Sequence, residues 1–357
     1  MGWFRTQSLN RSITTMTLQR SVSDKSSSKS GRRNNMFTEK RILFLYVDTP
    51  LHAGSGRGLG AVDLPLQRER VTGYPMVQST GLKGRLRDAY RTHHKLQDDD
   101  EAVTRLFGKA GESGESYAGS IAPGDARLLL FPVRSLAGVF AWTTSIHALS
   151  NFRRSAELGG HALGDFPDLH GLEVGKDDAW VCKPGVDGKP TTDLKAGSSV
   201  VLEEFSFTPQ PNDLVNKIGA WLAKYALPEN YSYWLDALPR KLCILHEDAF
   251  RDFCKYATEV QTHIRLDPNT KTVSGGALWT EESLPMDTLL YAPVMASGAR
   301  YKEDDKPGTE VAAEMLGQIT GLDLRHLQLG GDETTGQGWV SARWWAGMKE
   351  DKKEGAS

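Results

Sequence analysis

The segment Asp48–Arg70, DTPLHAGSGRGLGAVDLPLQRER, organises the rest of the chain. It follows an unbroken apolar run, Ile42 to Val47, which predicts a buried strand. The segment has no helical or strand period, and its glycines alternate with other residues at Gly54, Gly56, Gly58 and Gly60. Glycine costs backbone entropy on folding, so it is typical of places where the backbone approaches another group closely or takes a positive φ. A functional loop framed by His52 and Asp63 is therefore predicted.

Other interpretations of this loop are weaker. Its length disfavours a plain surface connection, because no clear element appears between Asp48 and Gly73. Gly56–Ala61 matches the loose GxGxxA pattern of dinucleotide sites, but Pro65 and the charged residues after it interrupt the helix that such a site requires. A phosphate-binding P-loop is excluded, since no Gly-Lys-Ser/Thr sequence occurs here.

The stretch Thr49–Arg87 resembles the backbone subunit of type III-B CRISPR effector complexes, a member of the RAMP superfamily of CRISPR RNA-binding proteins. Weaker resemblance continues through VFAWTTSIHALSNFRR, GALWTEESLP and LGGDETTGQGWV, so that it covers most of residues 41–340. The resemblance implies an α+β fold: an RRM-like (ferredoxin-like) core with a long inserted lobe and a β-hairpin thumb. It also implies copies that stack along a guide RNA and cleave paired target RNA with a divalent metal, Mg²⁺ or Mn²⁺.

The resemblance also assigns site residues. The catalytic aspartate of the family falls on Asp63, expected to act as a base or to hold the metal, and the loop histidine falls on His52. Acidic side chains that matter for cleavage fall on Glu281 or Glu282, whereas Ser283 stands where a tyrosine is expected. Carboxylates suit a hard cation. The alternative for the two glutamates is an exposed acidic turn.

A basic helix is predicted directly after the loop. Leu82, Leu86 and Leu96 recur at helical spacing. A stripe of cations repeats every fourth residue, at Lys83, Arg87, Arg91 and Lys95, with Arg85 near its start. Cations and helix N-termini both attract phosphates, so a guide-RNA contact is predicted. A solvated helix face is the alternative.

A second glycine-rich loop follows a strand predicted at Leu324–Leu329. Its glycines are predicted to contact RNA backbone in the same way as the first loop, at Gly330, Gly331 and Gly336. The segment 159–198 is predicted to be an insertion, and the sequence VDGKP within it favours a hairpin turn, which makes it the candidate thumb. A disordered surface insertion is the alternative there.

Composition limits the remaining possibilities. The 357 residues carry 43 Lys and Arg against 45 Asp and Glu, so any RNA site must be a local patch. The absence of an apolar run near eighteen residues argues against a membrane span. Three cysteines fit a reducing cytoplasm, and their spacing to histidines does not favour zinc. Residues 1–36 are basic and serine-rich, which predicts a disordered extension before a domain at 37–348 and a flexible tail at 349–357.

The prediction is therefore a cytoplasmic, metal-dependent endoribonuclease that binds CRISPR guide RNA, pairs with target RNA and assembles with other copies of itself and other effector subunits in antiviral defence. The rival hypothesis is a non-catalytic RNA-binding scaffold of the same kind of complex. A nucleotide-dependent oxidoreductase is a third and weaker hypothesis, since it rests on the lone glycine motif.

Overall fold

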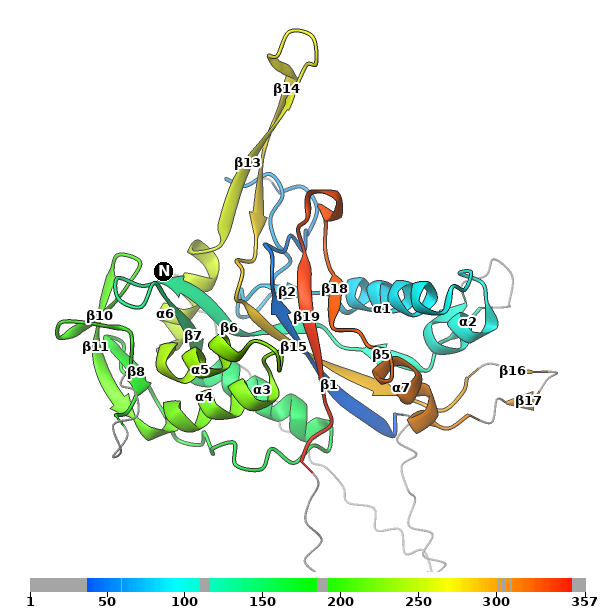
Figure 1. Ribbon diagram of the computed structural model, residues 1–357, viewed down its shortest axis with the longest axis horizontal. Coiled ribbons are helices and arrows are strands. Elements are labelled where there is room, and N and C mark those ends of the chain that lie inside the picture. The colour runs from blue at the N-terminus through cyan, green and yellow to red at the C-terminus, as the bar shows by residue number, and fades with distance from the viewer. Residues whose placement is uncertain are drawn as a thin grey trace, which may run out of the picture. The chain divides into compact units, whose positions relative to one another are not determined.

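The computed structural model describes residues 37–58, 60–109, 116–184, 192–300, 302–303, 306–307 and 310–348 (Figure 1). Contacts divide the chain into two units, Met1–Asn35 and Met36–Ser357, and every described residue belongs to the second. The predicted extension 1–36 and the predicted tail 349–357 therefore lie outside the described residues.

The strand predicted from the apolar run is β1, Glu39–Val47. It pairs antiparallel with β15 (Leu289–Ala296) on one side and β19 (Trp339–Trp345) on the other. Successive side chains of a strand point to opposite faces. Both faces of β1 are buried, in a first core cluster through Leu43, Leu45 and Val47 and in a second through Ile42, Phe44 and Tyr46. Two covered faces explain why the strand is apolar from Ile42 to Val47.

β1 belongs to a mixed sheet of thirteen strands in the described part of the chain, in the order β18-β19-β1-β15-β6-β7-β12-β8-β11-β10-β9, with β2 beside β6 and β5 beside β15. The β7–β12 and β8–β11 pairs are parallel. The bounds of the other strands are β2 Met76–Val77, β5 Ile121–Pro123, β6 Ala126–Arg134, β7 Phe140–Ser145, β8 Asp178–Cys182, β9 Lys195–Ala196, β10 Ser199–Leu202, β11 Phe205–Asn212, β12 Leu242–Leu245 and β18 His326–Gln328.

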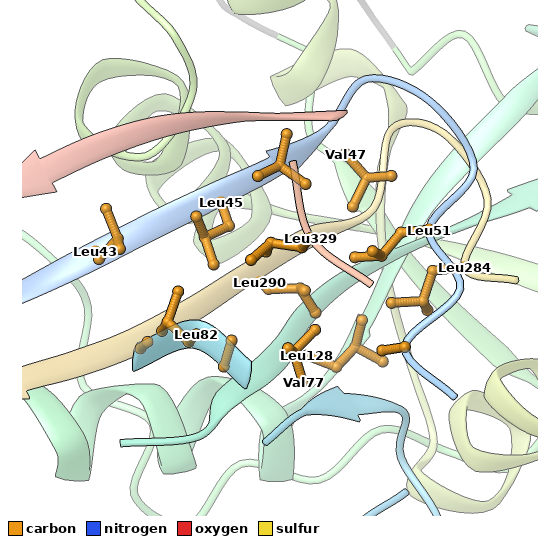
Figure 2. Close-up of a cluster of buried hydrophobic side chains, with 14 of the residues drawn as sticks. Leu43, Leu45, Val47, Leu51, Val77, Leu82, Leu128, Leu284, Leu290 and Leu329 are labelled. Carbon is orange, nitrogen blue, oxygen red and sulfur yellow. The ribbon is translucent and has the colours of Figure 1, made fainter. Parts of the chain in front are cut away.

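Helices cover both faces of this sheet. The first core cluster contains residues of α1 (Ser79–His94), α2 (Glu101–Phe107), α6 (Glu247–Tyr256) and α7 (Ala312–Thr320). Figure 2 shows Leu82 of α1 packed among Leu43, Leu45 and Leu290. The second cluster contains residues of α3 (Ile146–Leu158), α4 (Asp213–Tyr225) and α5 (Ser232–Lys241). None of the helices in the described residues is long and apolar enough to cross a membrane.

A long hairpin projects away from the large sheet (Figure 1). It consists of β13 (Glu259–Leu266) and β14 (Val273–Ser283), paired antiparallel. The sequence analysis did not predict this hairpin, because it considered Glu281 and Glu282 only as site residues or as an exposed acidic turn. The smaller elements are β3 Gly108–Lys109, β4 Tyr117–Ala118, β16 Lys302–Glu303, β17 Lys306–Pro307 and the 3₁₀ turn η1 Glu333–Thr335.

The predicted insertion at 159–198 contributes structure to the main body. It supplies β8 and β9 to the large sheet, and Phe166 and Leu169 to the second core cluster. The bend VDGKP lies outside the described residues, so the hairpin predicted there stays a prediction. The described chain is a mixed α/β structure with one large sheet and seven α-helices; the RRM-like core also stays a prediction.

The double-sided burial of β1 gives a test of the fold. Phe44 is fully buried, and its ring lies 5.7 Å from that of Phe152 between centroids. Phe44→Ala is expected to lower the free energy of unfolding by about 3–5 kcal/mol through lost burial and the cavity left behind. Urea denaturation measures this. Val71→Ala, at a side chain that is 96% exposed, is the control and is expected to change stability by less than about 0.5 kcal/mol. A loss below 1 kcal/mol at Phe44 would contradict the described core.

Candidate functional site

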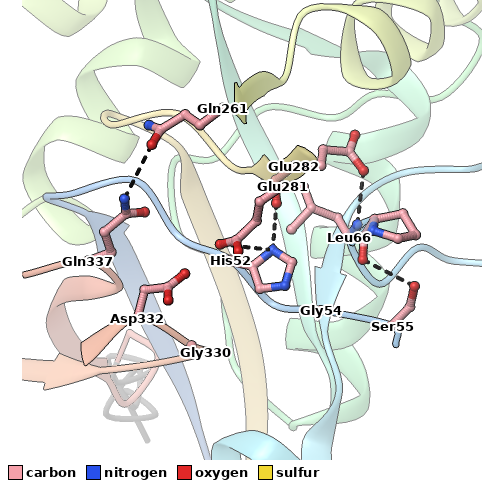
Figure 3. Close-up of polar contacts among 12 residues, drawn as sticks. His52, Gly54, Ser55, Leu66, Gln261, Glu281, Glu282, Gly330, Asp332 and Gln337 are labelled. Carbon is pink, nitrogen blue, oxygen red and sulfur yellow. Dashed lines mark hydrogen bonds and ion pairs between the residues drawn. The ribbon is translucent and has the colours of Figure 1, made fainter. Parts of the chain in front are cut away.

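The two glycine loops meet at His52, which connects three distant segments (Figure 3). The backbone carbonyl of His52 accepts a hydrogen bond from the backbone N–H of Gly331 at 3.0 Å. The ring Nδ1 lies 2.7 Å from the backbone carbonyl of Glu282. A carbonyl only accepts, so Nδ1 carries a proton. The ring is 9% exposed, so His52 holds loops together instead of presenting its imidazole to solvent.

Glycines allow this close packing. A Cβ at Gly54 would lie 2.5 Å from Nε2 of His52, and one at Gly330 would lie 2.1 Å from the His52 carbonyl oxygen. Gly330 also has a φ of +75°. The group that these two glycines approach is thus His52, and their predicted contact with RNA stays a prediction. Gly56 and Gly336 have positive φ and open space around them, so their predicted RNA contact stays a prediction.

Gln328 shapes the second glycine loop, and the sequence analysis missed it. Its side chain is 3% exposed. Its Nε2 lies 3.2–3.4 Å from four backbone carbonyls, those of Leu329, Gly330, Gly331 and Gln337. One buried amide therefore organises both ends of the loop. The available signal was a glutamine within the predicted strand Leu324–Leu329, one residue before two glycines.

Glu282 is a structural residue. Its Oε1 accepts hydrogen bonds from Arg68 and from Thr258, and its Oε2 accepts one from the backbone N–H of Leu66 at 2.9 Å. The side chain is buried at 6% exposure. The alternative of an exposed acidic turn is therefore wrong. Buried charges need paired hydrogen-bonding partners, and Glu282 uses them to fasten the first loop to the base of the hairpin.

Glu281 faces His52 and the second loop. Its Oε1 lies 3.6 Å from Nδ1 of His52, and its side chain is 5% exposed. Burial raises the pKa of Glu281 to about 7, with further contributions from a hydrogen bond to Asp332 and from the charge of Asp332. The structure thus brings the predicted residues His52 and Glu281 together and adds Asp332, which the sequence analysis did not single out.

Asp63 occupies a different environment. Its carboxylate is exposed, and its Oδ2 accepts hydrogen bonds from the backbone N–H and the hydroxyl of Thr280, at 2.8 and 2.9 Å. The backbone hydrogen bond from Thr280 is the main cause that lowers the pKa of Asp63, followed by the hydroxyl hydrogen bond. Asp63 is therefore ionised near neutral pH. It lines a groove of about 680 Å³ together with Arg57, Arg265 and Trp279.

The donor set around Asp63 does not fit a metal held by the chain alone. Only Oδ1 of its carboxylate lacks a hydrogen bond among the described residues. The described ranges contain no group of three or more His, Cys, Asp or Glu side chains able to hold a metal ion. All three cysteines lie within those ranges and are free and buried. The hypothesis of a zinc site built from these cysteines and nearby histidines therefore has no support among the described residues.

The basic stripe on α1 is largely engaged within the chain. Arg87 Nε bonds Asp98 at 2.9 Å, Arg91 bonds Asp88 at 2.8 Å, and Arg85 Nε donates to the backbone carbonyl of Gln328 at 2.7 Å. Lys83 makes no hydrogen bond or ion pair with any described residue. Burial lowers the pKa of Lys83, and the neighbouring cations Arg300 and Arg87 lower it further. Lys95 is exposed and also has no such side-chain partner among the described residues, so Lys83 and Lys95 are the cations of the stripe available to an incoming anion.

A family model described as the RAMP superfamily matches residues 44–341. The chain belongs to the RAMP superfamily. The matched range runs from β1 to β19, so it includes both glycine loops and the hairpin. The resemblance to type III-B backbone subunits is confirmed by the relatives of this RAMP protein as well.

Three relatives are informative. The chain is 36% identical over 301 residues to the CRISPR system Cmr endoribonuclease Cmr4 of Pyrococcus furiosus, covering 84% of this chain and 93% of the relative. The crystal structure of oligomeric Cmr4 from Pyrococcus furiosus has a TM-score of 0.63 at 27% identity, covering 87% of this chain and 99% of that one. A chain of a type III-B Cmr-beta complex bound to cognate target RNA has a TM-score of 0.61 at 19% identity, covering 87% and 98%, which shows likeness of fold alone.

The raised pKa of Glu281 gives a test of the site. The folded state keeps this carboxyl protonated up to about pH 7, whereas the unfolded chain releases the proton near pH 4.5. Its stabilising contribution is therefore complete below pH 4.5 and is lost as pH rises through 7. Glu281→Gln removes the titration, so its free energy of unfolding relative to wild type is expected to increase from pH 5 to pH 8 in urea denaturation. Parallel pH profiles of the two proteins would contradict the described burial.

Proposed function

We propose that this RAMP protein is a backbone subunit of a type III-B CRISPR effector complex, which binds guide RNA and cleaves paired target RNA in antiviral defence. A relative named an endoribonuclease matches 84% of the chain at 36% identity, and an oligomeric structure of a Cmr4 protein shares the fold. Assembly with guide RNA, target RNA, other copies of the chain and other subunits, in the cytoplasm, is part of the proposal.

One observation carries the assignment of cleavage: the exposed, ionised carboxylate of Asp63 lies in a groove beside Arg57, Arg265 and Trp279. Two guanidinium groups suit a phosphodiester. The indole of Trp279 lies against the ring of His263, with centroids 5.5 Å apart and planes 16° apart. Exposed aromatic faces stack unpaired bases in RNA-binding proteins. The groove thus combines groups that bind phosphate, base and hydroxyl.

The reaction that fits is attack by the target's own 2′-hydroxyl on the adjacent phosphorus. The 2′-oxygen–phosphorus bond forms and the phosphorus–5′-oxygen bond breaks, which leaves a 2′,3′-cyclic phosphate and a 5′-hydroxyl. Asp63 accepts the hydrogen bond of the attacking hydroxyl and orients it, and the proton that leaves this hydroxyl passes by way of solvent water to the departing 5′-oxygen. Because its pKa is lowered, the carboxylate of Asp63 is suited to act as a fixed negative charge. It is less suited to act as a general base, whose pKa should lie near neutral pH. Arg57 and Arg265 stabilise the negative charge that develops on the phosphate oxygens.

His52 and Glu281 support this site from behind. Both side chains are buried, so we assign them to holding the glycine loops and not to contact with RNA. The divalent metal stays a proposal, and no step above depends on it. Mg²⁺ usually keeps several waters and few protein ligands, so Asp63 and RNA phosphates would share it. Cleavage with and without a chelator tests this.

RNA contact away from the groove is proposed for Lys83 and for the hairpin β13–β14, which we assign as the thumb within an RRM-like architecture. The hairpin is amphipathic. One face carries Gln261, His263 and Trp279, and the other exposes Val260, Ile264 and Leu278 at 50–61%. Exposed apolar side chains on a projecting hairpin are typical of an interaction surface.

Asp63→Asn tests the cleavage assignment. Asn keeps the size and a carbonyl for Thr280 but removes the charge. In an assembly of the full chain with guide RNA and its partner subunits, cleavage is expected to fall by about 10²–10⁴-fold with target affinity nearly unchanged. The measurements are single-turnover cleavage and target binding in one preparation.

The matched control for Asp63→Asn is Asp168→Asn. Asp168 is also an exposed aspartate whose pKa is lowered chiefly by a backbone hydrogen bond, but it lies outside the groove. Its replacement is expected to leave cleavage unchanged. Normal cleavage by the Asp63 variant would support the rival hypothesis of a scaffold, and loss of guide binding would mean that Asp63 only shapes the loop.

Lys83→Gln tests the guide contact. Removing one phosphate contact is expected to weaken guide binding equally for different guide sequences and to reduce the slope of log affinity against log salt by about one. Lys217→Gln is the control, because Lys217 is 61% exposed and paired with Asp213 on α4. Identical salt slopes for Lys83→Gln and wild type would refute the contact.

A further inference from the structure

A polar cavity of about 410 Å³ lies between one edge of the large sheet and the connection from α4 to α5. β18 is the last strand at this edge, and its His326 is paired with Ser341 of β19. Arg343 lies two residues further along β19, so its side chain leaves the sheet on the same face as Ser341. The polar side chains that line the cavity are Glu229, Asn230, Arg325, His326, Ser341 and Arg343. None of them lines the Asp63 groove.

A chain of hydrogen bonds fixes one nitrogen of the His326 ring. Oδ1 of Asp48 accepts a hydrogen bond from the Tyr231 hydroxyl at 2.8 Å, and its Oδ2 accepts one from the Ser341 hydroxyl at 2.7 Å. Nδ1 of His326 lies 3.2 Å from Oγ of Ser341 and 3.7 Å from Oδ2 of Asp48. A hydroxyl has one proton, and Ser341 gives its proton to Asp48, so Nδ1 of His326 donates to Ser341.

The other ring nitrogen of His326, Nε2, is left for a ligand. The His326 side chain is 51% exposed, whereas Ser341 on its Nδ1 side is 3% exposed. The exposed edge of the ring is therefore the edge that faces away from Ser341. Nε2 makes no hydrogen bond with any residue of the described ranges. It donates to a deprotonated oxygen when the ring is charged and accepts from a protonated oxygen when the ring is neutral.

The two arginines of the cavity are paired only with exposed carboxylates. Arg325 Nε donates to Asp323 at 2.9 Å, and these side chains are 79% and 72% exposed. Arg343 Nη2 donates to Glu229 at 2.8 Å, and the Glu229 side chain is 83% exposed. Exposed ion pairs contribute little to stability. An incoming anion can therefore replace either carboxylate, and a guanidinium matches the oxygens of a phosphate group.

We propose that this cavity binds the phosphate monoester of a nucleotide, with His326, Arg325 and Arg343 as the groups that contact the phosphate. A phosphate monoester offers three strong acceptor oxygens, which suits three separate nitrogen donors better than the two oxygens of a carboxylate do. The volume is within the range of small-ligand sites. The exposed amide of Asn230 adds a donor and an acceptor that suit a base or a ribose. This site goes beyond the proposed cleavage reaction and does not depend on it.

The test is calorimetric titration of the full chain with adenosine monophosphate, adenosine and inorganic phosphate. Adenosine monophosphate is expected to bind at least about 10-fold more tightly than adenosine, and inorganic phosphate is expected to compete with it. His326→Ala and Arg325→Gln are each expected to weaken the binding of adenosine monophosphate by about 10-fold, the effect of losing one hydrogen bond to a charged group. A second readout is nitrogen-15 NMR of the imidazoles, in which the ligand is expected to shift the His326 signals.

Arg134→Gln and His170→Ala are the matched controls. Arg134 is 76% exposed and is paired with one carboxylate, that of Glu203, as Arg325 is paired with Asp323. His170 is exposed, and both control residues lie outside the cavity. Both variants are expected to keep the wild-type affinity. The high exposure of Arg325 keeps the test informative even where His326→Ala disturbs β18.

Short single-stranded RNAs with and without a 5′-phosphate identify the source of the phosphate. A preference for the phosphorylated RNA that disappears in His326→Ala would assign the site to an RNA terminus. Equal affinity for both RNAs, with adenosine monophosphate still bound, would assign the site to a free nucleotide.

Unchanged binding of adenosine monophosphate in both His326→Ala and Arg325→Gln would overturn the proposal. Adenosine that binds as tightly as its monophosphate, or binding that leaves the His326 signals in place, would overturn it as well. Cleavage by the assembled complex and by its Asp63→Asn variant reports on the proposed function separately, so the failure of one proposal is distinguishable from the failure of the other.

Discussion

The hydrogen bonds of His52 are the constraint on which the site depends. Its carbonyl holds Gly331 and its ring holds the carbonyl of Glu282, so one residue joins segments that lie 230 and 279 positions further along the chain. The sheet makes this possible, because β1 lies between β15 and β19. The loop after β1, the hairpin base before β15 and the loop before β19 therefore leave the sheet at one end.

Two carboxyl groups near this junction have opposite environments. Asp63 is exposed and accepts two hydrogen bonds from Thr280, which lowers its pKa. Glu281, the next residue in the strand after Thr280, is buried beside Asp332, which raises its pKa to about 7. Neighbouring residues of a strand face opposite ways, so β14 directs Thr280 toward Asp63 and Glu281 to the interior. This separation gives one group that stays charged at the surface and one that keeps a proton inside.

Sequence alone predicted the elements that depend on local pattern. The apolar run at 42–47 and the helical spacing of Leu82 and Leu86 gave β1 and α1 correctly. It failed where long-range contacts decide the outcome. Nothing local indicates that Glu282 is neutralised by Arg68, or that Gly54 lies against the imidazole of His52. The arginines of α1 were predicted to contact guide RNA, and the sequence did not indicate that Asp98 and the Gln328 carbonyl engage two of them.

The most direct test of the account is a structure of the assembled complex with guide RNA and a target whose reactive 2′-hydroxyl is replaced by hydrogen. The account predicts a target nucleotide in the groove beside Arg57 and Arg265, with its base on Trp279. It places the modified 2′-carbon about 3–4 Å from the Asp63 carboxylate, so that the natural 2′-hydroxyl would lie within hydrogen-bonding distance of that carboxylate. A target strand that passes elsewhere, with the groove free of RNA and no phosphodiester near Asp63, would contradict the account.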